Sequence, residues 1–218
     1  MLNLVIKDLK LSKKINIFGL LYALFIAAMG LTMPNQMVAN LLYILGMIIL
    51  IFILVIYTNG YDDKNKSEII LNSFPIDRAD IVRGKYITLL LFIIFGTGMV
   101  YLFTNIVSTL YKNNGEGASL WNIILVSNLS LIFYSLYYPI YFKVGEGIKI
   151  FNAVLWILMV IGPRIIAKFA EKMAKTGHLE RILAIDINRL NLYLLIFSLI
   201  IFYISLQISK RIYLNREF

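Results

Sequence analysis

Long apolar blocks separated by short polar segments dominate the chain. Six such blocks lie at 15–33, 37–57, 87–110, 120–142, 148–166 and 190–208. A helix needs about 20 apolar residues to cross the hydrocarbon core of a bilayer. A transmembrane barrel would show short segments of alternating polarity instead. The pattern predicts an all-α, polytopic membrane protein of about six transmembrane helices, with residues 1–218 forming one transmembrane domain.

The fifth block, 148–166, is the least regular of the six. Its apolar run is interrupted by Pro163 and Arg164, which leaves only about 15 residues where a full crossing needs about 20. Two arrangements fit this pattern. The helix can continue through Ile166 while Arg164 reaches the headgroups, or the chain can break at Pro163 into a re-entrant segment that protein covers.

Two segments outside the blocks have amphipathic patterns. In residues 1–14, Met1, Val5 and Leu9 recur at helical spacing among lysines, which favours an N-terminal helix on the membrane surface over a frayed basic tail. In the loop before the last block, Ile166, Phe169 and Met173 recur in a similar way. We therefore expect residues 167–189 to form an extracellular amphipathic loop, either on the membrane or in solvent.

Composition and charge agree with a membrane protein and orient it. The chain is 60% hydrophobic and 15% charged, with a net charge of +9. The basic residues flank apolar blocks and form no aromatic-interleaved face, so nucleic-acid binding is not predicted. Placing the N-terminus inside puts fourteen of the 21 Lys and Arg residues on the cytoplasmic side. This predicts cytoplasmic N- and C-termini, although the basic outer loop 164–189 runs against the rule.

No catalytic or metal-binding motif is present in the sequence. It contains no P-loop, no H-E-x-x-H and no G-x-S-x-G motif, and it has no cysteine. Its one histidine, His178, has no second ligand candidate nearby, so neither a metal site nor an enzyme is predicted. Acidic residues are nearly absent from the spans, which argues against an ion-coupled carrier. A membrane scaffold without transport activity stays open.

Polar and small residues inside the spans suggest helix contacts. Candidates for a transport pathway are Asn105, Ser108, Asn128 and Asn152, with Ser127 and Ser130 as further polar positions. The same side chains could instead form hydrogen bonds between helices. Gly19, Ala23 and Ala27 form a row of small residues on one helix face. Such a row lets two helices approach closely, either within the chain or at a dimer interface.

The polar segment 58–86 carries five basic and five acidic residues. Ser67 is expected to cap a short helix that ends before Pro75, and Asp77 to cap a second helix leading into the third span. Exposed aliphatic side chains between these charges suit docking to a soluble protein. The alternative is a surface loop without a partner.

Two stretches of sequence resemble a known family. DDKNKSEIILNSFPIDRADIVRGKY (62–86) and YYPIYFKVG (137–145) are similar to the ABC-2 type permeases, in particular the compact six-helix bacterial ABC exporters of type V exporter-like fold. With the six-span layout, the resemblance covers nearly the whole chain. Similar permeases export phenol-soluble modulins and peptide antibiotics.

The resemblance implies how the protein would work. Two permease chains, identical or different, would pair in the bacterial plasma membrane with two copies of a cytoplasmic ABC ATPase. That ATPase would carry the ATP and Mg²⁺. Coupling would use Asp62, Asp63, Lys64, Asn65, Lys66, Ser67, Glu68, Ile69, Pro75 and Arg78. The Gly19, Ala23 and Ala27 row would be the dimer candidate. Few polar residues line the spans, which favours an amphipathic or lipophilic cargo over a sugar or an ion. Since similar permeases export peptides, the resemblance implies an amphipathic peptide cargo, with sodium or drug extrusion as the alternative.

Overall fold

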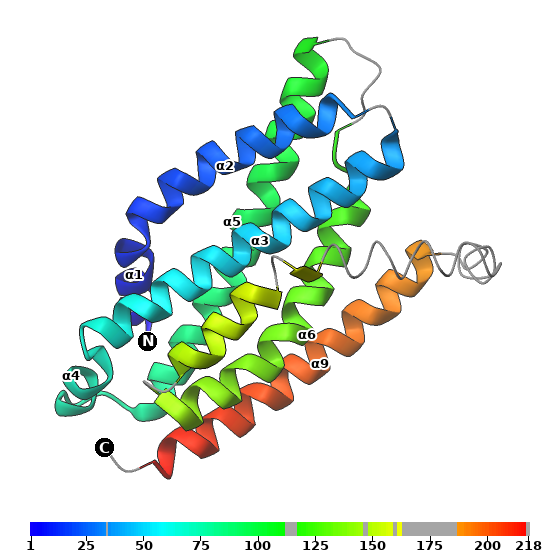
Figure 1. Ribbon diagram of the computed structural model, residues 1–218. Coiled ribbons are helices and arrows are strands. Elements are labelled where there is room, and N and C mark those ends of the chain that lie inside the picture. The colour runs from blue at the N-terminus through cyan, green and yellow to red at the C-terminus, as the bar shows by residue number, and fades with distance from the viewer. Residues whose placement is uncertain (34, 112–116, 146–147, 159–160, 163–186, 217–218) are drawn as a thin grey trace.

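All regular structure in the described part of the chain is helical (Figure 1). The computed structural model describes residues 1–33, 35–111, 117–145, 148–158, 161–162 and 187–216. The labelled helices are α1 (Leu2–Leu11), α2 (Lys13–Leu31), α3 (Gln36–Lys64), α4 (Ser67–Ser73), α5 (Arg78–Tyr111), α6 (Leu120–Val144) and α9 (Ile187–Leu214). The prediction of an all-α protein is therefore confirmed.

Five helices are long and apolar enough to cross a membrane. They are Lys13–Leu31, Gln36–Lys64, Arg78–Leu110, Leu120–Val144 and Asn188–Leu214. In the region of the predicted fifth span, a shorter apolar helix covers Ile148–Leu158. Most of the rest of that span, with Pro163 and Arg164, lies outside the described residues. So does the amphipathic pattern expected in 167–189, with His178.

The segment 58–86 contains much less loop than the sequence suggested. Helix α3 continues to Lys64, and α5 begins at Arg78. The last two turns of α3 contain poor helix formers such as Asn59, Gly60 and Asp62, so tertiary contacts, among them those of Asp62 with Lys7 and Lys85, support the helix there. α1, α4 and the C-terminus gather at the same end of the bundle (Figure 1). Contacts between Lys7 and Asp62, and between Arg78 and the backbone of Arg216, hold these segments together there.

The row of small residues on α2 is buried inside the chain. Ala23 and Ala27 are 0% exposed, and a Cβ atom on Gly19 would lie 3.2 Å from Leu50 of α3. The close approach continues at Gly46, where a Cβ would lie 2.8 Å from Ile26. These small residues let α2 and α3 pack closely within one chain. The structure therefore corrects the expectation of a dimer interface at this row in favour of internal packing.

A proline inside α6 is compensated by a side chain from α9. Pro139 has no N–H group and cannot donate to the carbonyl of Ser135, which lies four residues earlier in the helix. The Ser205 hydroxyl of α9 donates to that carbonyl over 2.6 Å. Ser205 also lies 2.7 Å from the hydroxyl of Tyr86 on α5. In an apolar surrounding, such a replacement donor allows a proline within a spanning helix.

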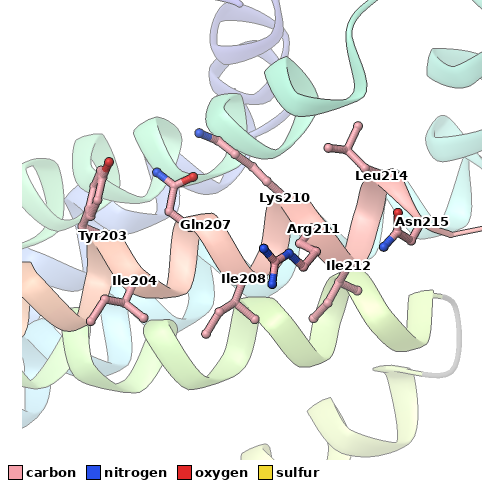
Figure 2. Close-up of a pocket in the computed structure, with 9 residues that line it drawn as sticks. All are labelled: Tyr203, Ile204, Gln207, Ile208, Lys210, Arg211, Ile212, Leu214 and Asn215. Carbon is pink, nitrogen blue, oxygen red and sulfur yellow. The ribbon is translucent and has the colours of Figure 1, made fainter.

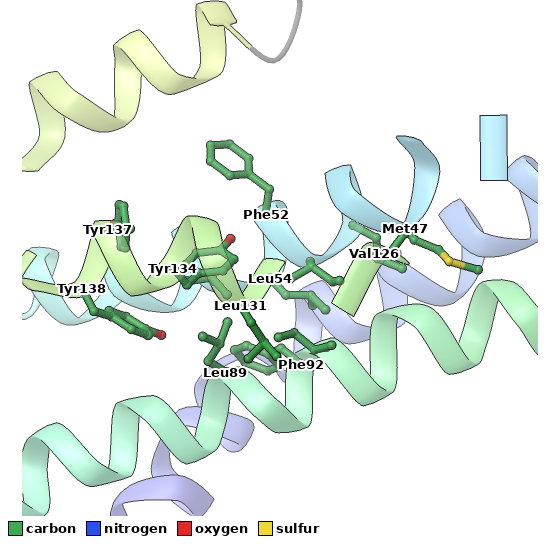
Figure 3. Close-up of a cluster of buried hydrophobic side chains, with 14 of the residues drawn as sticks. Met47, Phe52, Leu54, Leu89, Phe92, Val126, Leu131, Tyr134, Tyr137 and Tyr138 are labelled. Atoms are coloured by element: carbon green, nitrogen blue, oxygen red, sulfur yellow. The ribbon is translucent and has the colours of Figure 1, made fainter. Parts of the chain in front are cut away.

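Large apolar side chains of α3, α5 and α6 form the centre of the bundle (Figure 3). Leu54, Leu89 and Phe92 are at most 2% exposed, and Leu131 is also buried. Lipid tails are as apolar as these side chains, so close van der Waals packing holds the centre together. Tyrosines of α6, among them Tyr137 and Tyr138, extend this packing toward the end that carries α4.

The outer face of α9 is open and largely apolar. A groove of about 640 Å³ follows Tyr203, Ile204 and Ile208 toward Arg211 (Figure 2). Apolar side chains give way to basic ones toward the C-terminus. This sequence of side chains suits a helix that passes from hydrocarbon to headgroups.

Candidate functional site

A short helix projects from the end of the bundle that carries both termini. The chain leaves α3 and turns at Lys66, whose φ of 50° is left-handed, and α4 follows over Ser67–Ser73. Pro75 lies just beyond the end of α4, as the sequence predicted. Asp77 accepts a hydrogen bond from the backbone N–H of Ala79 at the start of α5, so the predicted capping role of Asp77 is confirmed.

The predicted cap at the start of α4 is wrong. The N-cap position is Lys66, no side chain caps the helix, and Ser67 is its first residue. The left-handed turn at Lys66 moves the helix start by one residue. Ser67 therefore does not hold the position from which its hydroxyl could accept from the first free N–H groups.

The exposed side of α4 is apolar. Ile69 is 59% exposed, Ile70 is 52% exposed, and Phe74, directly after the helix, is 56% exposed. We call Ile69, Ile70 and Phe74 the α4 patch. Lys64, Asn65 and Lys66, at the turn before the helix, are exposed as well. An apolar patch beside basic side chains has the composition of a protein docking surface.

The opposite side of α4 is fixed to the C-terminal segment. Glu68 accepts from the Arg216 guanidinium over 2.8 Å, and the side-chain amide of Asn72 donates to the Tyr213 hydroxyl over 3.0 Å. The Arg216 guanidinium also donates to the backbone carbonyl of Phe142 at the end of α6. The Arg78 guanidinium in turn donates to the backbone carbonyl of Arg216. Helix α4 is therefore held by α6 and α9, and its patch is presented on an anchored element.

Gly145 makes room for this anchor. It ends α6 with a φ of 61°, a backbone conformation that side chains with a Cβ rarely adopt. A Cβ atom there would collide with the Arg216 guanidinium. The glycine that closes the stretch YYPIYFKVG thus lets Arg216 cross the end of α6 and reach Glu68.

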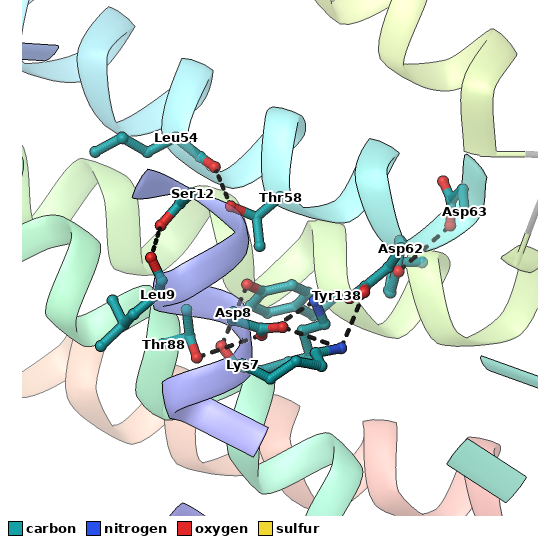
Figure 4. A network of polar contacts seen from close by, with 12 residues as sticks. Lys7, Asp8, Leu9, Ser12, Leu54, Thr58, Asp62, Asp63, Thr88 and Tyr138 are labelled. Atoms are coloured by element: carbon teal, nitrogen blue, oxygen red, sulfur yellow. Dashed lines mark hydrogen bonds and ion pairs between the residues drawn. The ribbon is translucent and has the colours of Figure 1, made fainter. Parts of the chain in front are cut away.

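Four charged side chains lie together where α1, α3 and α5 meet; Figure 4 labels Lys7, Asp8 and Asp62 among them. Asp62 accepts from Lys85 over 2.5 Å and from Lys7 over 2.9 Å. Asp8 lies 3.1 Å from Lys85 and 3.2 Å from Lys7. Asp8, Asp62 and Lys85 are at most 7% exposed. Two acids and two bases leave this charge cluster neutral, and each buried charge has a partner of opposite sign.

The charge cluster lies next to the base of α4. A cavity of about 30 Å³ is lined by Asp62 and Lys85 on one side and by Glu68, Leu71 and Tyr213 on the other. A space this small has room for water and little more. The charge cluster and the anchor of α4 thus line the same small cavity. A movement of α1, α3 or α5 would therefore be transmitted to α4 over a short distance.

The structure divides the predicted coupling residues into two groups. Lys64, Asn65, Lys66, Ile69 and Pro75 are exposed, so a partner can reach them. Asp62, Glu68 and Arg78 make the internal contacts described above, while Asp63 and Ser67 line the small cavity. Lys7, Asp8 and Arg216 are not predictable from the sequence, because nothing in the spacing of these distant residues shows that they meet the segment 58–86.

The described pathway candidates connect helices or loops. Asn128 donates to the backbone carbonyl of Asn191 over 2.9 Å, and Asn152 accepts from the Tyr137 hydroxyl over 3.1 Å. Asn105 donates to the carbonyl of Ala118 over 3.1 Å. Ser108, the fourth candidate, is not without a partner either. Asn128 and Asn152 thus form hydrogen bonds between helices, the other possibility that the sequence left open, while Asn105 binds the loop that precedes α6.

The long apolar helices define a polytopic membrane protein, and one end of the bundle presents an anchored, exposed apolar patch. A model of the ABC-2 family transporter proteins matches residues 3–214. The chain belongs to this family: it is the membrane permease of an ABC transporter, a multi-pass protein that associates with an ABC ATPase subunit and in a bacterium lies in the plasma membrane. Searches among curated proteins and among solved structures found no match.

Proposed function

We propose that the chain is the permease of an ATP-driven exporter, and that α4 is the helix that couples it to the ATPase. The observation that carries this proposal is the α4 patch, with Ile69, Ile70 and Phe74 all more than half exposed on a helix whose other side is anchored. An apolar cluster on a projecting helix fits into a groove of a soluble protein. The basic residues around it favour a cytoplasmic position for this end.

In this proposal the energy comes from the partner. Two ATPase subunits bind ATP and Mg²⁺, and each receives the α4 patch of one chain in a permease dimer of identical or different chains. When the ATPases close, α4 moves with them. Its anchor to α6 and α9, through Arg216 and Tyr213, turns that movement into a rigid-body shift of the spans.

A pair of matched truncations tests the coupling proposal. Ile70 on α4 and Leu214 at the end of α9 are 52% and 50% exposed at the same end of the bundle. We expect Ile70→Ala to weaken binding of the co-expressed ABC ATPase at least about fivefold, as central apolar contacts do. Leu214→Ala should leave binding unchanged. Titration of the ATPase onto nanodisc-embedded permease measures both, and equal affinities of the two variants would contradict the proposal.

The proposed cargo is an amphipathic peptide, exported from the cell. Aromatic and aliphatic side chains dominate the inside of the bundle, which suits an apolar cargo surface better than a hydrated ion or a sugar. The permease and its ATPase, reconstituted together in liposomes, should hydrolyse ATP faster when an amphipathic helical peptide is added. Stimulation by sodium or by small drugs, and not by such peptides, would refute the peptide cargo.

A further inference from the structure

The groove on the outer face of α9 joins an apolar wall to a cationic end (Figure 2). Its volume of about 640 Å³ lies within the range of about 300–1,000 Å³ that is typical of ligand pockets. Tyr203, Ile204 and Ile208 form the apolar wall, and all three side chains are exposed. In its most apolar stretch, α9 has the smallest share of buried residues among the five long apolar helices of the described chain. The wall is therefore open to the hydrocarbon of the bilayer.

Two basic side chains, Lys210 and Arg211, form the cationic end of the groove. Arg211 is exposed and Lys210 is partly exposed, and within the described part of the chain neither has a carboxylate partner. This distinguishes them from Arg216, which pairs with Glu68. Long basic side chains at the end of a spanning helix reach the headgroups while their stems lie along apolar surface. The two cations are thus available to an anion from outside the chain.

The order of side chains along the groove matches the order of chemical groups in a phospholipid. Gln207 precedes Arg211 by four residues, so the side-chain amide starts about 6 Å deeper along the helix axis. A phospholipid carries its phosphate outermost, then its ester carbonyls, then its acyl chains. A phosphate at Arg211 therefore brings an ester carbonyl toward the Gln207 amide and an acyl chain toward Ile204 and Ile208.

A second copy of the chain fits this face less well than a lipid does. Two copies with the same orientation in the membrane are related by an axis along the membrane normal, and a two-fold contact uses the same patch of both. Such a contact would bring the two Arg211 guanidinium groups together, with the Lys210 ammonium groups beside them, and like charges across an interface repel. An anionic lipid supplies the opposite charge. The cytoplasmic leaflet, where the charge distribution of the chain predicts this end, carries such lipids.

We propose that this groove binds one anionic phospholipid of the cytoplasmic leaflet. Arg211 and Lys210 bind the phosphate, the Gln207 amide donates to an ester carbonyl, and one acyl chain lies along Ile208 and Ile204. The phosphate also offsets the repulsion between two neighbouring cations at the end of α9. The inference goes beyond the proposed coupling and cargo and depends on neither.

Native mass spectrometry of the permease in a neutral detergent measures this binding. The protein is titrated with phosphatidylglycerol and, separately, with phosphatidylcholine of the same acyl chains. Each basic side chain near an anionic lipid strengthens binding about fivefold, so the first phosphatidylglycerol should bind about 25-fold more tightly than the first phosphatidylcholine. The variant Lys210→Gln/Arg211→Gln should lose this preference.

The matched control is Lys13→Gln/Lys14→Gln. These two exposed lysines are neighbours at the start of α2, so the control lowers the net charge by the same amount as the change on α9. It should keep the preference of the parent. A preference lost on α9 and kept in the control supports a site built from the groove.

A second pair of variants tests the apolar wall with both cations in place. Ile208→Trp puts a larger ring into the groove, so several CH₂ groups of the acyl chain lose their contact and phosphatidylglycerol should bind at least about fivefold more weakly. Ile196→Trp is the control, since Ile196 is exposed on the same helix outside the groove. It should bind phosphatidylglycerol like the parent.

Four results would overturn the inference. Equal affinities of the parent for the two lipids would remove the anionic preference. Equal loss of preference in the α9 and α2 double variants would leave only general charge attraction. Displacement of phosphatidylglycerol by soluble glycerol 3-phosphate would show that the headgroup alone fills the site. A dimer in the same spectra that Ile208→Trp dissociates, while the lipid preference stays, would identify the groove as an interface between copies.

Discussion

Removal of Lys85 should destabilise the protein strongly, because it leaves two buried acids with one base. In the charge cluster, Asp62 and Asp8 lie 2.5 Å and 3.1 Å from Lys85, and both are at most 6% exposed. After Lys85→Met, the two carboxylates would share Lys7, whose side chain is 29% exposed. Breaking a buried ion pair from one side lowers the free energy of unfolding by about 3–5 kcal/mol, and we expect a loss in this range.

The double variant Lys85→Met/Asp62→Leu separates charge balance from lost packing. It leaves one acid and one base, Asp8 and Lys7, which lie 3.2 Å apart. Replacing both members of a buried pair by apolar residues is often nearly neutral. The double variant should therefore be more stable than Lys85→Met alone, with a coupling energy of at least about 2 kcal/mol between the two positions.

Reversible unfolding by SDS in mixed micelles, followed by tryptophan fluorescence, measures these free energies. Lys10→Met is the matched control, since Lys10 is an exposed lysine on α1, and it should change stability by no more than about 0.5 kcal/mol. The account of the charge cluster would be refuted if the free energy of unfolding of Lys85→Met stayed within about 1 kcal/mol of the parent. It would also be refuted if the loss in the double variant equalled the sum of the losses in Lys85→Met and Asp62→Leu.

Two further predictions concern contacts of α6 and α9. Gly145→Ala places a Cβ atom against Arg216 at a positive φ, so it should weaken ATPase binding in the titration described above; Gly60→Ala, where a Cβ would meet no atom within 4 Å, should not. Ser205→Ala removes the donor to the Ser135 carbonyl and should lower the free energy of unfolding by about 1–3 kcal/mol. In a Pro139→Ala background, which restores the backbone donor, the same change should cost less than in the parent.

The sequence predicts the helices well, because membrane insertion demands long apolar blocks that are visible without any tertiary information. It also predicts the end of α4 before Pro75 and the cap at Asp77, since both depend on neighbouring residues alone. The extent of α3 and α5 beyond the membrane was not apparent, because hydropathy marks the apolar block and not the end of the helix. The row at Gly19 shows a similar limit: small residues indicate close packing but do not identify the partner helix.

The charge cluster shows why the site was only half predictable. The segment 58–86 attracted attention because its charges are dense, and their density suggested a partner outside the chain. Asp62 instead pairs with Lys7 and Lys85, and Glu68 pairs with Arg216, so part of that charge holds the chain itself together. The residues of this segment that stay exposed are the α4 patch and the basic turn before it. A buried acid and an exposed acid look alike in a sequence, and only the position of the opposing base tells them apart. The charges therefore fix the position of α4, and in the proposed coupling the exposed apolar side chains between them bind the ATPase.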